Sequence, residues 1–134
     1  MKKKSLKTLT TKLDAVFSKY IRFRDADGRG NARCITCDRT FPVSEMDAGH
    51  FVGRRHRSTR WSEQNVHAQC RYDNRYCEGK KDVYAVKLVE RYGPNILLEL
   101  QEQKNRVVKW TPADLEELIE IYKAKLKELE LETA

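Results

Sequence analysis

Residues 69–77 read QCRYDNRYC, and together with the earlier stretch CITC, which starts at Cys34, they decide how the middle of the chain folds. Two cysteines separated by two residues can grip a zinc ion from one turn, and a second such pair normally completes a tetrahedral site. Here Cys34 and Cys37 form the first pair and Cys70 begins the second, but Asp73 stands where its second cysteine belongs. We therefore expect a zinc site with an unusual fourth ligand.

The fourth ligand has two candidates. Asp73 has the expected spacing from Cys70, and a carboxylate oxygen is an accepted zinc ligand. Cys77 offers a softer sulfur one helical turn later, and in a helix all three positions would share a face. Spacing favours Asp73, and Cys77 stays as the alternative. Buried, metal-free cysteines are the competing interpretation, but so small and polar a region benefits from a structural metal.

The composition fits one small, basic domain over residues 1–134. The net charge is +7, with 35% charged and 40% hydrophobic residues, which favours a polyanionic partner such as nucleic acid. No apolar run is long enough for a membrane span, and no apolar segment follows the MKKK start as in a signal peptide. Four cysteines without an export signal indicate a reducing, cytoplasmic location and metal binding rather than disulfides.

Helical patterns flank the cysteine-rich region. Residues 5–24 predict an N-terminal amphipathic helix, with apolar positions at helical spacing and basic residues on the other face. Residues 33–81 hold all the cysteines and histidines in short, strand-like pieces, and residues 82–134 predict C-terminal helices. The fold class is therefore α+β, a zinc-stapled core flanked by terminal helices. The apolar stripes of the first and last helices comprise Leu6, Leu9, Leu13, Val16, Phe17 and Tyr20, and Leu115, Leu118, Ile119, Tyr122, Leu126 and Leu129.

Capping residues predict where the C-terminal helices begin and end. Asp82 is the expected N-cap and Gly93 the expected C-cap of one helix, and Pro94 is expected to start a short helix through Gln101. Thr111, followed by a proline and an acid, marks the start of the last helix.

A second set of polar residues lies between and just after the zinc half-sites. It comprises Asp47, His50, Asn65, His67 and Asn74. A hydrolytic nuclease needs a base that deprotonates water and a hard cation that stabilises charge on the phosphate. His50 can be the base, while Asp47 and Asn74 can offer oxygen to magnesium. Each residue alone is weak support, so the prediction depends on the combination.

These motifs resemble a known family. The order Cys-x-x-Cys, Gly-His, Asn, Cys-x-x-x-Asn resembles the HNH or His-Me finger nucleases. The stretches DAGHF, RWSEQNVHAQC, DNRYCEG, VKLVERYGP and KWTPADLEELIEIYKAKLKELE resemble the phage NinG/Rap recombination endonucleases, over roughly residues 14–130. The resemblance implies a ββα-metal (His-Me finger) core over residues 33–81. It also implies an endonuclease that cleaves Holliday junctions and D-loops, with structural Zn²⁺ and catalytic Mg²⁺ or Mn²⁺.

The resemblance also implies residue roles and a setting. His50 corresponds to the general base, Asn74 to a magnesium ligand, and Asn65 to the residue that orients the motif. Many HNH proteins carry an acid or histidine directly before the base, but here Gly49 stands there. Asp47 is therefore the expected acidic ligand, with His67 in reserve. The expected location is the cytoplasm of a phage-infected or prophage-bearing bacterium, and a homodimer would supply two active sites per junction.

Basic residues mark a DNA-facing surface. The stretch GRRHRSTR places Arg54, Arg55, Arg57 and Arg60 in one loop between the two expected strands of the core. Guanidinium groups suit phosphate oxygens, so recognition of backbone and shape is expected rather than recognition of sequence. A lysine-rich N-terminal arm is either a second DNA contact or a solvated tail: Lys2, Lys3, Lys4, Lys7 and Lys12.

Three other functions compete with a junction nuclease. A non-catalytic zinc-ribbon DNA-binding module would explain the charge and the cysteines but gives His50 and Asn74 no purpose. An HNH nuclease acting on linear duplex DNA would use the same residues on another substrate. A protein-interaction module fits worst, because it leaves the arginine-rich loop unexplained.

Overall fold

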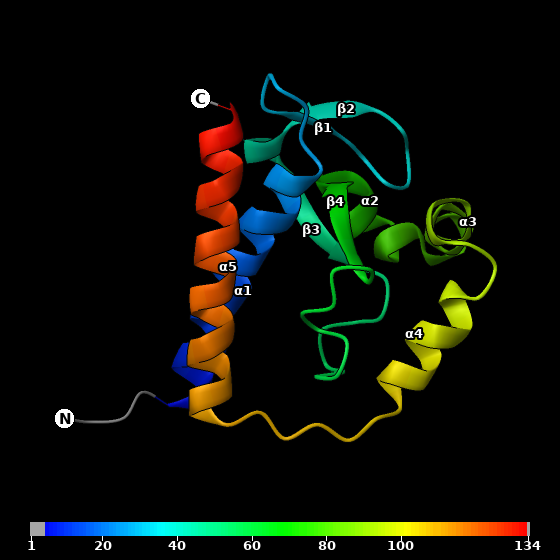
Figure 1. Cartoon of the computed structure of the whole chain (residues 1–134). Coiled ribbons are helices and arrows are strands. Elements are labelled where there is room, and N and C mark those ends of the chain that lie inside the picture. The colour runs from blue at the N-terminus through cyan, green and yellow to red at the C-terminus, as the bar shows by residue number, and fades with distance from the viewer. Residues whose placement is uncertain (1–4, 134) are drawn as a thin grey trace.

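The chain forms a mixed α+β structure in a computed structural model that describes residues 5–133 (Figure 1). Two short 3₁₀ turns, Val43–Glu45 and Glu78–Lys80, connect some of its elements. In chain order the helices and strands are α1 (Leu6–Arg24), β1 (Asn31–Arg33), β2 (Thr40–Pro42), β3 (Met46–His50), β4 (Val66–Cys70), α2 (Arg71–Tyr76), α3 (Lys81–Tyr92), α4 (Ile96–Lys104) and α5 (Pro112–Thr133). Lys2, Lys3 and Lys4 of the predicted basic arm lie outside the described residues.

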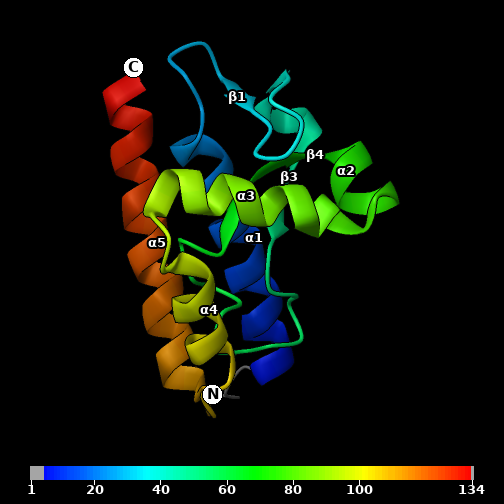
Figure 2. The same cartoon turned by 90° about the vertical axis from the view of Figure 1, so that its right-hand side faces the viewer.

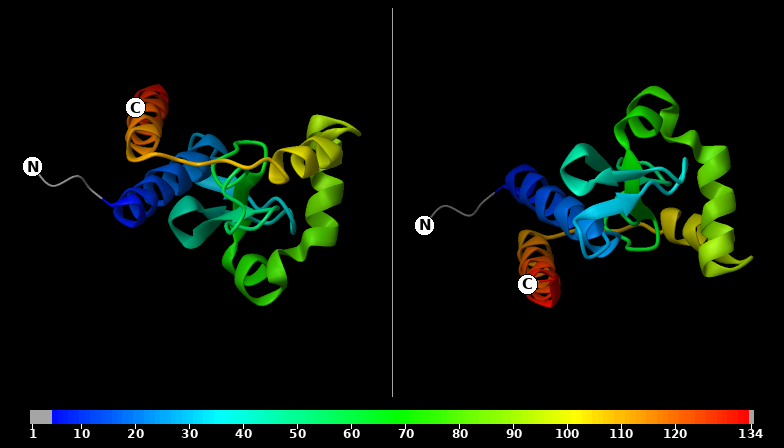
Figure 3. Two further views of the ribbon diagram at one scale, coloured as in Figure 1. Left: turned by 90° about the horizontal axis from the view of Figure 1, so that it is seen from below. Right: turned by 90° about the horizontal axis from the view of Figure 1, so that it is seen from above.

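The strands pair in two small antiparallel sheets, β1 with β2 and β3 with β4. The β3–β4 register runs from Met46 opposite Cys70 to His50 opposite Val66, and every residue of β4 is buried. This hairpin lies between the α1/α5 pair and helices α3 and α4 (Figures 1 and 3). Figure 2 shows α3 crossing in front of the hairpin. The second strand leads directly into α2, so the middle of the chain has the order strand, strand, helix.

Most helix ends follow the capping residues. Ser5 caps α1, since its Oγ accepts from the Thr8 N–H at 3.1 Å. Gly93 ends α3 with a φ of 98°, a conformation that glycine adopts without strain. At the start of α5, Thr111 and Asp114 form the predicted reciprocal cap, each side chain accepting from the other's N–H.

Two predicted boundaries were wrong. The N-cap of α3 is Lys80 in a left-handed conformation, and Asp82 lies in the first turn, where its charge still suits the helix dipole. Helix α4 begins at Ile96 rather than Pro94 and continues past Gln101. Both differences amount to about half a turn of helix and leave the apolar faces where the pattern places them.

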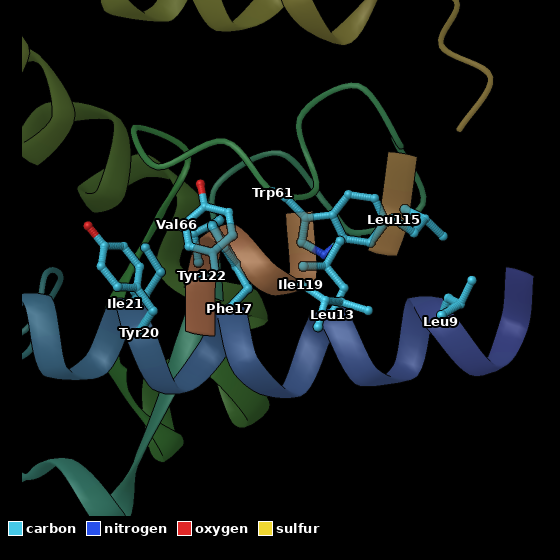
Figure 4. Close-up of a cluster of buried hydrophobic side chains, with 10 residues drawn as sticks. All are labelled: Leu9, Leu13, Phe17, Tyr20, Ile21, Trp61, Val66, Leu115, Ile119 and Tyr122. Carbon is cyan, nitrogen blue, oxygen red and sulfur yellow. The ribbon is translucent and has the colours of Figure 1, made fainter. Parts of the chain in front are cut away.

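The largest core cluster joins α1 to α5. The predicted stripes of the two helices face each other and enclose Trp61 and Val66 from the central region (Figure 4). Leu6 is the exception, since it is 39% exposed and lies outside the cluster. The rings of Phe17 and Tyr122 meet edge to face, with centroids 4.9 Å apart. Because α1 and α5 are far apart in sequence, this apolar contact joins the two terminal helices to each other and to the central region.

A partly buried polar contact adds to this helix pairing. Glu63, in the loop between β3 and β4, accepts hydrogen bonds from the hydroxyls of Tyr20 (3.0 Å) and Tyr122 (3.1 Å) and pairs with Lys125 at 2.8 Å. Burial, together with the nearby carboxylate, raises the pKa of Tyr20 to about 12. Burial alone would raise the pKa of Glu63, but Lys125 and the tyrosines outweigh it and lower that pKa. One carboxylate therefore ties α1, α5 and the central loop together.

Replacing Glu63 by alanine should destabilise the fold by about 1–2 kcal/mol, because two tyrosine hydroxyls lose a partly buried acceptor. Urea unfolding at pH 7 measures this, and Gln64→Ala at the exposed neighbouring position is the control. The folded-state pKa of Glu63 is lowered, so the difference should be complete above pH 4.5 and shrink as pH falls below it. Equal stability of the two variants at pH 7 would remove this role of Glu63.

Candidate metal centre and adjoining polar pocket

Four side chains converge where β1, β4 and α2 meet. The ligand atoms of Cys34, Cys37, Cys70 and Asp73 all lie within 4.8 Å of one another, and all but Cys37 are buried. Three sulfurs and one carboxylate oxygen suit a tetrahedral zinc site. The predicted spacing thus brings four ligands together that could hold a metal ion. Within residues 5–133, this is the one group of three or more histidine, cysteine or acidic side chains whose ligand atoms lie close enough together to share a metal ion.

Hydrogen bonds prepare the cluster for a cation. The Sγ of Cys34 accepts from the Cys70 N–H at 3.2 Å and the Cys37 N–H at 3.4 Å, and Thr36 Oγ1 lies 3.3 Å away. Burial would raise the pKa of Cys34, but these bonds outweigh it and lower the pKa, which favours the thiolate. Burial and the neighbouring Cys34 raise the pKa of Cys70 to about 12. A cation bound between the sulfurs would offset the repulsion between neighbouring thiolates.

The fourth position belongs to Asp73. Its Oδ2 accepts a hydrogen bond from Thr36 Oγ1 at 2.7 Å, which orients the carboxylate within the cluster. Cys77 lies outside the group because α2 ends at Tyr76, so the helical face that would carry a sulfur back to the cluster stops short. The structure therefore places the spacing-preferred residue, and not the alternative, beside the three cysteines.

Next to the cluster lies a polar pocket of about 480 Å³. Its wall combines residues from α1, β3, the β3–β4 loop, α2 and the start of α3. The side chains used in the argument below are Asp14, Asp47, His50, Arg54, Asn74, Arg75 and Lys81. Three predicted site residues thus share one cavity, with Asp47 and His50 from β3 and Asn74 from α2.

Asp47 is an ionised carboxylate held from two sides. Its Oδ2 accepts from Asn74 Nδ2 at 3.0 Å, and Arg75 forms a bidentate pair with both oxygens at 2.8 Å. Burial would raise the pKa of Asp47, but the bonds from Arg75 and Asn74 outweigh it and lower the pKa. The carboxylate is therefore available as a negative oxygen ligand, provided that Arg75 moves aside.

The His50 ring is held by a hydrogen bond at one nitrogen. Its Nε2 lies 2.8 Å from the carbonyl oxygen of Arg60. A carbonyl only accepts, so Nε2 carries the proton and the neutral ring keeps its lone pair on Nδ1. Burial, with a contribution from Arg54, lowers the pKa of His50 to about 4. The imidazole is thus neutral at cellular pH, more firmly than its ordinary pKa would make it.

A salt bridge from α1 supports this arrangement. Asp14 accepts from Arg60 Nε at 3.0 Å and Trp61 Nε1 at 2.9 Å, and its other oxygen pairs with Arg60 Nη2. These contacts fix the turn at Arg60, whose carbonyl oxygen accepts the hydrogen bond from His50 Nε2. Lys81 donates to the carbonyl of His50 from the other side. The sequence analysis missed Asp14, Arg75 and Lys81, because nothing in the local pattern around them points to the pocket.

The glycine before His50 has a steric cause. Gly49 pairs with His67 across the hairpin, and a Cβ at Gly49 would lie 2.0 Å from Gln69 Oε1 and 2.9 Å from Gln69 Cβ. Gln69 is fully buried, and its Nε2 bonds to Thr36 beside the metal cluster and to the Gly79 carbonyl. No side chain fits at position 49 without displacing Gln69, so this position cannot carry an acid, and Asp47 and Asp14 are the acidic side chains that line the pocket.

Two predicted site residues lie outside the pocket wall. Asn65 is fully buried and bonds the backbone of Val52 in both directions as well as the Thr59 carbonyl, so it pins the β3–β4 loop. His67 is also fully buried, with one ring nitrogen bonded to Tyr84 Oη and the other to Tyr92 Oη. The structure does not bring His67 to the pocket, and neither nitrogen is available as a reserve metal ligand.

The arginine-rich loop does connect β3 and β4. Arg54, Arg55 and Arg57 are exposed, whereas the Arg60 side chain is only 19% exposed and is committed to Asp14. The loop is braced from α4 and the following segment: Ser58 bonds the Lys104 carbonyl, and Trp110 Nε1 bonds the Arg57 carbonyl. Arg60 therefore organises the loop, and three arginines remain for an anionic ligand.

The buried environments predict how the three histidines titrate. Burial lowers the pKa of His50 to about 4 and that of His67 to about 3, so both rings should stay neutral from pH 8 to pH 5. His56 is more exposed and should titrate first. Imidazole proton resonances followed by NMR across this range measure it, and a His50 midpoint near the ordinary value of about 6.5 would contradict the assigned burial. Because both folded pKa values are lowered, protonation favours unfolding, and stability should fall as pH drops below about 6.5.

The fold and site thus define an α+β protein with a cysteine cluster that could hold a metal ion and a separate polar pocket. The sequence matches the family described as Bacteriophage Lambda NinG protein over residues 1–132, and the chain belongs to this NinG family. Protein ninG of Escherichia phage lambda and that of Salmonella phage P22 are each 33% identical to it over 116 residues, which cover 82% of this chain and 52% of the relative. Protein ninG of Enterobacteria phage H19B is 31% identical over the same length.

The chain therefore spans about half the length of the curated relatives it matches. No solved structure matches it. Within residues 5–133, none of the helices combines the length and apolar character that crossing a membrane requires.

Proposed function

We propose that this protein is a structure-specific DNA endonuclease that cleaves branched recombination intermediates, such as Holliday junctions and D-loops, by metal-dependent phosphodiester hydrolysis. One observation carries the proposal: His50, with Nδ1 free to accept a proton, lines the same pocket as the oxygen donors Asp47 and Asn74. The strand–strand–helix order of β3, β4 and α2 beside the cysteine cluster supports a His-Me finger core. In this proposal the cluster holds structural zinc.

His50 acts as the general base. Its Nδ1 takes the proton of the attacking water, while the Nε2–H bond to the Arg60 carbonyl keeps the ring in the right tautomer. The lowered pKa keeps the base unprotonated in the free protein. An anionic phosphate bound beside the ring would raise that pKa towards the working pH, which suits proton transfer.

Asp47 and Asn74 would hold the catalytic cation. Carboxylate and amide oxygens are donors that Mg²⁺ accepts, and here their side chains are in direct contact. When bound there, the cation would supply Lewis-acid stabilisation of negative charge on the phosphate oxygens. Arg75 now occupies both Asp47 oxygens, so it must exchange this carboxylate for another anion when a cation binds. A phosphate oxygen of the substrate is suited to receive its guanidinium group.

Cleavage of synthetic DNAs tests the proposal. A four-way junction, a D-loop, a fork and a linear duplex of equal length are incubated with and without Mg²⁺ or Mn²⁺. We expect nicks in the branched DNAs only when the metal is added. Equal cutting of linear duplex would indicate an HNH nuclease of the ordinary kind. Binding without cutting under every condition would leave a zinc-ribbon binding module.

Removing the three exposed loop arginines should weaken binding to all DNA sequences alike. Each lost phosphate contact reduces the salt slope of log K by about 0.9, so the Arg54→Ala, Arg55→Ala, Arg57→Ala triple variant should lose up to about 2.7. Arg60 is left in place because its loss would disturb the loop. Fluorescence anisotropy across a salt series measures the slope.

The control for the loop removes the same charge elsewhere. Arg29, Arg106 and Lys127 are exposed and lie outside the pocket wall, so their triple alanine variant should retain most of the slope. If both triple variants lose the same slope, general charge rather than this loop attracts the DNA.

A further inference from the structure

Helix α2 presents two large aromatic side chains to solvent. Tyr72 is 66% exposed and Tyr76 is 77% exposed, and their ring centroids lie 6.1 Å apart with the planes tilted by 37°. Neither hydroxyl makes a hydrogen bond within residues 5–133. Tyrosine is usually half-buried, so two neighbouring exposed rings on so short a helix need an explanation. Packing within the chain does not provide one.

The two tyrosines occupy a face of their own on α2. Successive helical residues are turned by about 100°, so positions four apart fall on one side and adjacent positions do not. Asp73 faces the metal cluster and Asn74 faces the polar pocket, as their contacts show. The pair Arg71 and Arg75 lies between the Asn74 side and the tyrosine side. Around the circumference of α2, the pocket side is therefore followed by the two guanidinium groups and then by the two aromatic rings.

The surroundings favour an anionic partner. The side chains of Arg71 and Arg75 are 47% and 54% exposed. Both face Asp47, and Arg71 also donates to the Ser44 carbonyl, so a phosphate would replace these contacts. Lys80 follows the short connection after α2 and lies 3.9 Å from Asp73. Figure 2 shows α2 at the edge of the molecule, on the side away from α5, so a long polymer can approach it. Aromatic rings beside cations provide what an unpaired nucleic-acid strand needs, namely faces for its bases and positive charge for its phosphates. Duplex DNA hides its bases in the stack and gains nothing from exposed rings.

We propose that Tyr72 and Tyr76 form a stacking platform for unpaired bases of single-stranded DNA, whose backbone crosses Arg71 and Arg75 towards the pocket. The platform rests on the proposed function only in the direction of the strand, because stacking itself requires no cleavage. It gives the chain a means of distinguishing branched DNA from continuous duplex. Unpaired or unstacked bases occur at forks, gaps and junction centres, next to the bonds to be cut.

The test measures binding without added divalent cation, so cleavage plays no part. Fluorescein-labelled single-stranded and duplex oligonucleotides of equal length are titrated with the full chain, the Tyr72→Leu, Tyr76→Leu double variant and the matching double phenylalanine variant. Leucine keeps an apolar surface but removes the ring, and phenylalanine keeps the ring but removes the hydroxyl. Both positions are exposed, so the fold and zinc content should be unchanged.

The leucine variant should lose roughly 5- to 150-fold in affinity for single strand per stacked base, with little change for duplex. The phenylalanine variant should bind like the wild type. A 2-aminopurine base in the single strand should be quenched by the wild type and the phenylalanine variant but not by the leucine variant. This readout distinguishes stacking from a general loss of binding.

Three results would overturn the platform. They are an unchanged single-strand affinity in the leucine variant, an equal loss for single strand and duplex, or the same 2-aminopurine signal in all variants. The first would leave a protein partner as the better explanation of the exposed rings. The proposed nuclease fails separately: a wild-type chain that quenches 2-aminopurine but never cuts a junction keeps the platform and loses the hydrolysis.

Discussion

The His50→Ala variant will cut a synthetic junction about 10²- to 10⁴-fold more slowly than the wild type, which is the usual contribution of a general base. It should still fold, retain zinc and bind branched DNA, because the imidazole is not part of the cysteine cluster. The arginine-rich loop loses the bond from His50 to the Arg60 carbonyl, but Asp14 still holds the Arg60 and Trp61 side chains. Single-turnover cleavage across a magnesium series measures the rate. His56→Ala, at the half-buried histidine of the loop outside the pocket wall, is the matched control and should cut normally.

Asn74→Ala distinguishes loss of the base from loss of the cation. Removing an oxygen donor weakens cation binding, so higher magnesium should restore part of the Asn74→Ala rate and none of the His50→Ala rate. Near-normal cutting by His50→Ala at any magnesium concentration would remove the proposed mechanism. The zinc-ribbon binding module would then describe the chain better.

Loss of the structural metal should have the largest effect on the fold. Zinc binding by small cysteine-rich sites is worth about 10–16 kcal/mol, which is comparable with the whole stability of a small domain. Cys34→Ser should therefore lose zinc and unfold the region from β1 to α2. Helices α1 and α5 should keep part of their helical structure, because they pack against each other. Metal content and hydrogen exchange of the central amides measure the two effects.

Variants of the two candidate fourth ligands complete this experiment. Asp73→Ala should lose most of its zinc, and Cys77→Ala should keep it, because only Asp73 lies within the cluster. Full zinc in both variants would mean that another group, such as water, completes the site. Full zinc and an unchanged melting temperature in Cys34→Ser would contradict a structural metal at this position.

Sequence reasoning was most successful where the cause is local. Caps such as Gly93 and Thr111 act within one turn, and the helical stripes depend mainly on spacing, so both were predictable. The metal cluster was predictable for a similar reason, because each half-site is a short motif and zinc chemistry requires the halves to meet. Asp73 needed only the same two-residue spacing.

The remaining features depend on contacts between distant segments. Asp14 contacts Arg60 across 46 positions of the sequence. Because of this contact, an arginine expected to bind DNA instead holds the turn whose carbonyl oxygen bonds to His50. Likewise, Tyr84 and Tyr92 of α3 hydrogen-bond both ring nitrogens of His67. These contacts exist only because α3 packs against β4 in the tertiary fold. A sequence pattern indicates that a charged or aromatic side chain is present, but the tertiary fold decides whether that side chain is free.

The crowded functions of helix α2 limit which mutations this segment can accept during evolution. Its six residues divide among the metal cluster, the pocket, the arginines and the tyrosines, with no residue serving only as a spacer. Inserting or deleting one residue here would turn everything beyond it by about 100° and misplace several groups at once. Single replacements at the exposed tyrosines or arginines would alter one property and leave the others. Related chains should therefore differ here by substitution and keep the length from Cys70 to Tyr76 constant.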